Sequence, residues 1–188
     1  MTAYWELAVV LAAAVNPAAI AAAASELPGP LRTRAWAVAI AWAIGAGLMA
    51  AAAYGADRLL AGLELSHETF RIAAGAVLVV TGARETWRGS PVVIAVPQRG
   101  WEQGIYPLGV PLFASPSGAM AAVALAGDPA VGPAKALSAA IPVLLAAAAA
   151  ALFARDCHRG GWRAAGQLVG ALSVAVGVAF VVAGVRSV

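Results

Sequence analysis

The run ALSAAIPVLLAAAAAALFA, residues 136–154, is uncharged from end to end and almost entirely apolar. A bilayer core about 30 Å thick is crossed by a helix of roughly 20 such residues. Similar runs recur along the whole chain. The sequence therefore predicts an all-α integral membrane protein in which lipid covers most of the apolar surface.

Apolar runs with few or no charges occur in six places and predict six transmembrane helices, at residues 4–24, 35–56, 69–87, 105–127, 136–154 and 164–185. The composition agrees, because 62% of the 188 residues are hydrophobic and only 11% are charged. A soluble domain of this length could not bury so much apolar surface. We expect one membrane domain over residues 1–188, with the lipid bilayer as its main partner.

The segment 69–87 is the least apolar of the six, because Arg71, Arg84 and Glu85 lie within it. These three residues are expected either at the ends of the helix, where long charged side chains can extend to the headgroups, or facing protein. The sequence accordingly predicts no acidic side chain deep in the membrane.

Basic residues are scattered singly between the apolar runs, which argues against nucleic acid as a partner and indicates membrane orientation instead. The connections after the first, third and fifth runs hold Arg32, Arg34, Arg84, Arg88, Arg99, Arg155, Arg159 and Arg163, and the opposite side holds Arg58, Arg71, Lys135 and Arg186. Since cytoplasmic loops are enriched in basic residues, both termini are predicted to lie outside, with the chain in the cell inner membrane.

The two halves of the chain resemble each other when one is shifted by roughly 96 to 99 residues. Asn16-Pro17 then aligns with Ser115-Pro116, each in the first helix of its half. A unit of three helices is odd in number, so the second copy enters the membrane from the opposite side. The prediction is two inverted three-helix repeats, at about 1–90 and 103–188.

Prolines inside two corresponding membrane helices point to a binding site. A proline removes one backbone hydrogen bond and displaces a carbonyl, which leaves polar groups to be satisfied in the membrane. Paired interruptions of this kind often mark a substrate site at the midplane, although ordinary kinks bonded to a neighbouring helix are the alternative. The predicted substrate-binding residues are Asn16, Pro17, Ser115, Pro116, Ser117 and Gly118.

Other chemistry has little support in the sequence. Cys157 is the only cysteine, which excludes an internal disulfide and a thiolate metal cluster. His67 and His158 are expected on opposite sides of the membrane, so they cannot share a metal. Asp57 and Asp128 lie at helix ends rather than deep in the membrane, where a protease would need them. We expect no enzyme activity, no metal and no cofactor.

Three stretches resemble the MarC family in order and spacing: Asn16-Pro17, residues 70–78 (FRIAAGAVL) and residues 106–118 (YPLGVPLFASPSG). The resemblance implies six membrane helices, both ends outside, and membership of the LysE-type transporter group, which includes transporters of small neutral amino acids. This chain departs from the family pattern at Ser115-Pro116-Ser117, where Gly-Pro-Gly is usual, and at Ala74, where a paired glycine is usual.

The predicted function is a secondary transporter or exporter of a small neutral solute, such as glycine, alanine or serine, working by alternating access. A membrane structural or accessory subunit without transport activity is the alternative. Gly170, Gly177 and Gly184 recur every seven residues and so share one helix face. That face is expected to form either a seam between the repeats or a contact in a homo-oligomer.

Overall fold

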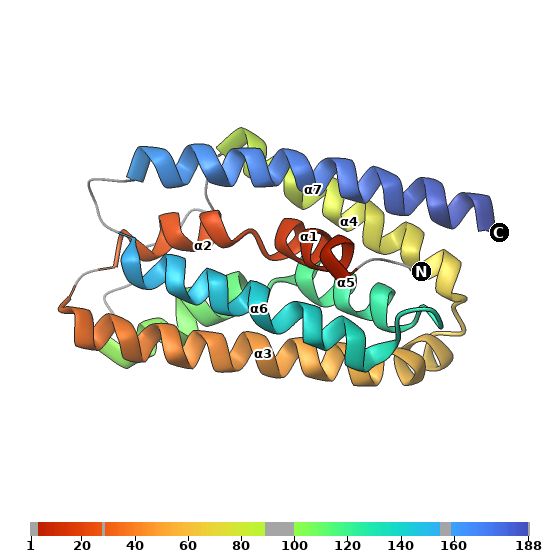
Figure 1. Cartoon of the computed structure of the whole chain (residues 1–188), viewed down its shortest axis with the longest axis horizontal. Coiled ribbons are helices and arrows are strands. Elements are labelled where there is room, and N and C mark those ends of the chain that lie inside the picture. The colour runs from red at the N-terminus through yellow and green to blue at the C-terminus, as the bar shows by residue number, and fades with distance from the viewer. Residues whose placement is uncertain (1–3, 28, 89–99, 155–158, 188) are drawn as a thin grey trace.

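A computed structural model describes residues 4–27, 29–88, 100–154 and 159–187. Every regular element in these residues is a helix. In chain order the elements are α1 (Tyr4–Val15), α2 (Pro17–Ala24), α3 (Leu31–Gly62), α4 (His67–Arg88), η1 (Gly100–Gly104), η2 (Ile105–Phe113), α5 (Pro116–Ala126), α6 (Gly132–Phe153) and α7 (Arg159–Ser187). They form an elongated bundle in which α1 begins and α7 ends at the same end (Figure 1).

Four helical segments are long and apolar enough to cross a membrane, namely Tyr4–Ala24, Leu31–Gly62, Gly132–Phe153 and Gly160–Ser187. The bent pair Gly100–Phe113 and Pro116–Ala126 would make a fifth, with an angle of 51° between its parts. The expected apolar spans are thus confirmed at four of six places, and at a fifth if the bent pair counts as one span. The segment 69–87 does form a helix, α4, but the charged residues near both of its ends keep it from qualifying as a span by composition.

Both helix interruptions fall at the expected prolines. The first apolar run divides into α1 and α2 at Asn16, and the fourth divides at Ala114 and Ser115, just before α5. The chain ahead of the second break is irregular, because η2 departs from helical geometry at Tyr106 and Val110. The sequence prediction of two broken helices is confirmed.

The broken first helix lies at the centre of the bundle. In its most apolar stretch 72% of the residues are buried within the protein, against 28% in each of α3 and α7. Figure 1 shows α1 and α2 between the α4–α7 pair and the α3–α6 pair. Alanine makes this enclosure possible, because residues 18–24 carry small side chains at all positions except Ile20.

Helices α4 and α7 pack along their glycines in an antiparallel seam. A side-chain carbon placed on Gly75 would lie 2.6 Å from the Gly177 carbonyl oxygen, and one on Gly82 would lie 2.6 Å from that of Gly170. Gly184 meets the first turn of α4 in the same way, at Glu68 and Ile72. The glycine face of α7 therefore forms a seam within the chain, and the oligomer alternative for this face is wrong.

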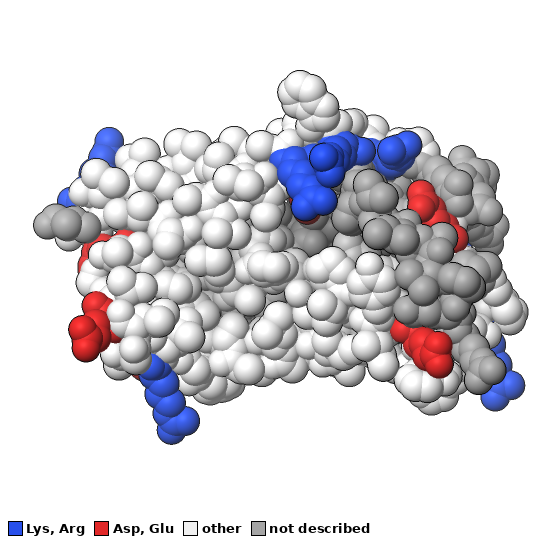
Figure 2. All heavy atoms as spheres, turned by 180° about the vertical axis from the view of Figure 1, so that it is seen from behind, with Lys and Arg blue, Asp and Glu red and all other residues white. Residues whose placement is uncertain are grey.

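The surface agrees with a membrane environment. Figure 2 shows charged side chains gathered at the two ends of the bundle and a broad uncharged band between them. One cluster of basic side chains is an exception, because it lies on the uncharged band rather than at an end of the bundle. It borders a hollow in the face that the figure shows. The uncharged band is what lipid chains contact in a membrane-spanning bundle.

Candidate functional site

The first break is built by Asn16 and Pro17. Asn16 adopts left-handed backbone angles (φ 51°, ψ 73°), a conformation that asparagine tolerates better than most residues. Its side-chain Oδ1 accepts a hydrogen bond of 3.1 Å from the backbone N–H of Ala19. Pro17 then fills the first position of α2, where the missing N–H costs nothing. The pair ends one helix and starts the next.

The second break uses the same plan. Ser115 has an extended backbone (φ −74°, ψ 139°), and its Oγ accepts a bond of 3.1 Å from the N–H of Gly118. Pro116 occupies the first position of α5. A side-chain carbon placed on Gly118 would lie 2.8 Å from Ser115 Oγ, the atom that caps this helix start. Each half of the chain therefore holds a polar cap followed by a proline.

The two breaks meet at one carbonyl oxygen. In an unbroken helix the Ala14 carbonyl would accept from the N–H four residues later, but the helix ends at Val15. Ser117 Oγ donates to this oxygen at 2.7 Å, and Ser115 Oγ lies 3.4 Å from it. A carbonyl freed by the first break is thus satisfied by hydroxyl groups of the second.

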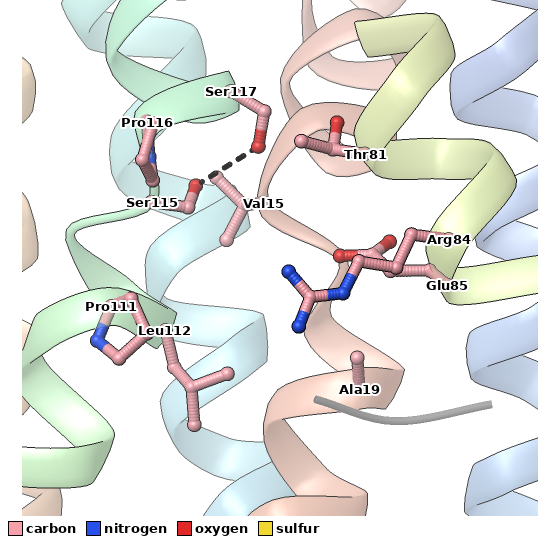
Figure 3. A pocket seen from close by; sticks show the side chains of 10 residues that line it. All are labelled: Val15, Ala19, Thr81, Arg84, Glu85, Pro111, Leu112, Ser115, Pro116 and Ser117. Carbon is pink, nitrogen blue, oxygen red and sulfur yellow. Dashed lines mark hydrogen bonds between the residues drawn. The ribbon is translucent and has the colours of Figure 1, made fainter. Parts of the chain in front are cut away.

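A cavity of about 290 Å³ opens beside this contact. Figure 3 shows side chains from both breaks on one side and from α4 on the other. The residues that line the cavity are Val15, Ala19, Thr81, Arg84, Glu85, Pro111, Leu112, Ser115, Pro116 and Ser117. Its walls combine an apolar floor with hydroxyl groups, one guanidinium and one carboxylate.

The predicted site residues divide into two groups. Ser115, Pro116 and Ser117 line the cavity as expected. Pro17 and Gly118 are not among the lining residues, and neither is Asn16. Its amide is only 1% exposed, because its oxygen caps α2 and its nitrogen is turned toward α4 and α7.

The amide of Asn16 holds a carboxylate that the sequence analysis placed elsewhere. Asn16 Nδ2 donates to Glu85 Oε2 at 2.6 Å and to the Gly166 carbonyl at 3.0 Å. Because Asn16 lies inside the segment 4–24, Glu85 is at the level of the breaks. The expectation of no acidic group at this depth is wrong, and for Glu85 the structure bears out the alternative that the side chain faces protein.

A signal for these residues was present in the sequence. Arg84 and Glu85 are adjacent, so in a helix they project about 100° apart, and both can reach one cavity if α4 turns that side toward it. Figure 3 shows both side chains directed at the space between α4 and the second break. Thr81, one turn earlier, also lines the cavity and bonds back to the Val77 carbonyl at 2.8 Å.

These features define an all-helical integral membrane protein in which two broken helices meet at a partly polar cavity. The whole chain, residues 1–188, matches the model of the family described as MarC family integral membrane protein. The chain belongs to the MarC family, as its motifs indicated. Searches of curated proteins and of solved structures gave no match.

Proposed function

We propose that the protein is a secondary transporter or exporter of small neutral solutes, with small amino acids as the substrate class. The observation that carries this proposal is the cavity between the two helix breaks. Broken helices that meet inside a membrane bundle commonly form substrate sites. A volume of about 290 Å³ is at the lower end of the roughly 300–1,000 Å³ of pockets for drug-sized ligands, and so suits a smaller molecule.

The chemistry of the walls suits a zwitterion. Arg84 can bind a carboxylate with two parallel N–H bonds, and the start of α5 adds the positive end of a helix dipole nearby. The hydroxyl oxygens of Thr81 and Ser115 can accept bonds from an ammonium group. Pro111 and Leu112 supply an apolar wall for a short side chain. Ser115, Pro116 and Ser117 keep their proposed part, whereas Asn16, Pro17 and Gly118 would shape the site from behind.

Alternating access would arise from movement of two three-helix units, about 1–90 and 103–188. The matching order of a polar cap, a proline and a helix in α2 and α5 supports this division. In the proposed arrangement a pseudo-twofold axis in the membrane plane relates the units. Superposition of the units by rotation about the membrane normal instead would contradict the inverted repeat.

Orientation of the chain in the cell inner membrane can be tested with cysteine labelling. Cys157 is first replaced by serine, and single cysteines are then introduced at Leu63 and Gly161, which lie at opposite ends of the bundle. With both termini outside, an impermeant maleimide applied to intact cells should label Leu63→Cys and leave Gly161→Cys unlabelled until the membrane is opened. Labelling of Gly161→Cys in intact cells would mean that the chain has the opposite orientation.

Transport itself is tested with purified protein in proteoliposomes and radiolabelled glycine, alanine and serine. Ser117→Ala should lower the rate about tenfold, because it removes the shorter bond between the breaks and leaves the Ala14 carbonyl with only the 3.4 Å contact to Ser115, at a cost of roughly 1.4 kcal/mol. Ser138→Ala is the matched control, since Ser138 is exposed on α6 and its side-chain hydroxyl bonds only to the Lys135 carbonyl of the same turn.

Absence of transport for all three amino acids would favour an accessory subunit. If Ser117→Ala transports as fast as Ser138→Ala, the second break is not part of the substrate site.

A further inference from the structure

The carboxyl group of Glu85 is bound by Asn16 and also borders the cavity. Its Oε2 accepts from Asn16 Nδ2 at 2.6 Å, while the residue itself lines the cavity wall. Asn16 cannot rotate away, because its Oδ1 caps α2 and its Nδ2 also donates to Gly166. Figure 3 shows the carboxylate between α4 and the second break. Glu85 is therefore held in place while remaining within reach of water in the cavity.

Few charged residues surround Glu85. Arg84 is the other charged residue lining the cavity. Residues 4–24 hold one charged residue, Glu6, at the far end of α1, and residues 105–126 hold none, with Tyr106 as their only titratable side chain. Helix α7 presents the Gly166 carbonyl, and its Arg163, like Arg88 of α4, is exposed about one turn away. Glu85 is the single acidic residue among the described lining residues.

We propose that Glu85 is the proton carrier of this protein, binding one proton and releasing it on the other side of the membrane in each transport cycle. The proposal rests on the transport function proposed above and specifies its coupling. An acidic side chain within a membrane bundle, facing a cavity, is the usual place for such a group. A proton needs only one carboxylate oxygen, whereas a sodium ion would have to collect several oxygen ligands.

The structure links the proton to the helix contacts. When the cavity is open to one side, the carboxylate takes a proton from water there and becomes a neutral carboxylic acid. Its bond with Asn16 then changes from charge-assisted to neutral, and charge-assisted bonds are roughly twice as strong. Because Asn16 caps α2 and bonds Gly166 on α7, protonation weakens the attachment of α4 at the meeting point of α2 and α7. Loss of the proton to the opposite side restores that attachment.

The test uses full-length protein in proteoliposomes with alanine as the probe, comparing the wild type with Glu85→Gln. Glutamine keeps an oxygen that can accept from Asn16 but cannot carry a proton. At one proton per solute, a gradient of one pH unit can sustain up to roughly tenfold accumulation of alanine. We expect the wild type to approach this value, and Glu85→Gln to exchange labelled for unlabelled alanine without accumulating it. Glu68→Gln, at the other end of α4, is the matched control.

A second variant distinguishes the loss of a proton-binding group from misfolding of the protein. Glu85→Asp retains a carboxyl group and should retain accumulation at a reduced rate, and a pH-sensitive dye inside the vesicles should report proton movement with alanine in this variant but not in Glu85→Gln. Accumulation by Glu85→Gln equal to wild type would overturn the inference and leave transport standing. Wild-type exchange that ignores the pH gradient but follows a sodium gradient would also overturn it. Failure of the wild type to move any of the three amino acids would overturn both proposals.

Discussion

Gly177→Val is expected to force α4 and α7 apart and to lower the melting temperature of the protein by about 10 °C. A side-chain carbon at Gly177 would lie 2.6 Å from the Gly75 carbonyl oxygen and 2.8 Å from the Val79 backbone nitrogen. Both are backbone atoms, so no side-chain rotation can relieve the clash. Overpacking of this kind costs roughly 3 kcal/mol, and each kcal/mol shifts melting by about 2–4 °C in a chain of this size.

The measurement is thermal unfolding of the detergent-solubilised protein, followed by circular dichroism. Gly47→Val is the matched control, because no atom lies within 4 Å of a side-chain carbon placed on this exposed glycine of α3. Its melting temperature should stay within a few degrees of wild type, since surface substitutions usually change stability by less than about 0.5 kcal/mol. Equal melting of the two variants would mean that the glycine seam does not hold α4 against α7.

Asn16→Ala is expected to cost about 3–5 kcal/mol of folding stability and to reduce transport at least tenfold. Removal of the cap on α2 costs about 1 kcal/mol, and loss of the donor to Glu85 leaves a part-buried carboxylate unsatisfied, at about 1–3 kcal/mol. The left-handed backbone at this position also costs alanine about 1 kcal/mol of conformational energy. Because the side chain of Asn16 makes three hydrogen bonds, its loss should lower folding stability as well as transport.

Two further variants separate these contributions in the same unfolding and transport assays. Asn16→Gly relaxes the backbone requirement, so it should recover about 1 kcal/mol relative to alanine. Asn16→Asp can still cap α2 but places a second carboxylate against Glu85, and like charges at this distance oppose each other. We expect Asn16→Asp to recover no transport at neutral pH. Wild-type stability in Asn16→Ala would show that this amide does not hold the break together.

The helices and their interruptions could be predicted because they follow from local chemistry. Apolar runs of sufficient length form membrane helices, and a polar cap before proline ends one helix and begins another. Asn16-Pro17 and Ser115-Pro116 carry that information within two residues each. The family was likewise evident from short motifs, and the match over residues 1–188 confirms it.

Only the wall of the cavity that the second break forms could be predicted from the sequence. The wall that α4 forms depends on how far this helix reaches across the bundle. Local rules place Arg84 and Glu85 at a helix end and therefore near the headgroups. The structure instead brings the last turns of α4 against the first break, where Asn16 binds Glu85. The glycine seam held a clue to this position, since Gly75 and Gly82 repeat the seven-residue spacing of Gly170 and Gly177. Matching the two spacings would have fixed α4 beside α7.

The central position of α1 and α2 has a consequence for how the protein is made. This segment leaves the ribosome before helices α3 to α7, yet in the finished bundle 72% of its most apolar stretch is covered by protein. Asn16 must therefore enter the membrane before α4 and α7 have been synthesised, and its side-chain nitrogen gains both of its partners only when Glu85 and Gly166 arrive. Membrane insertion and final burial of the first helix are separate events, and the second of them waits for nearly the whole chain.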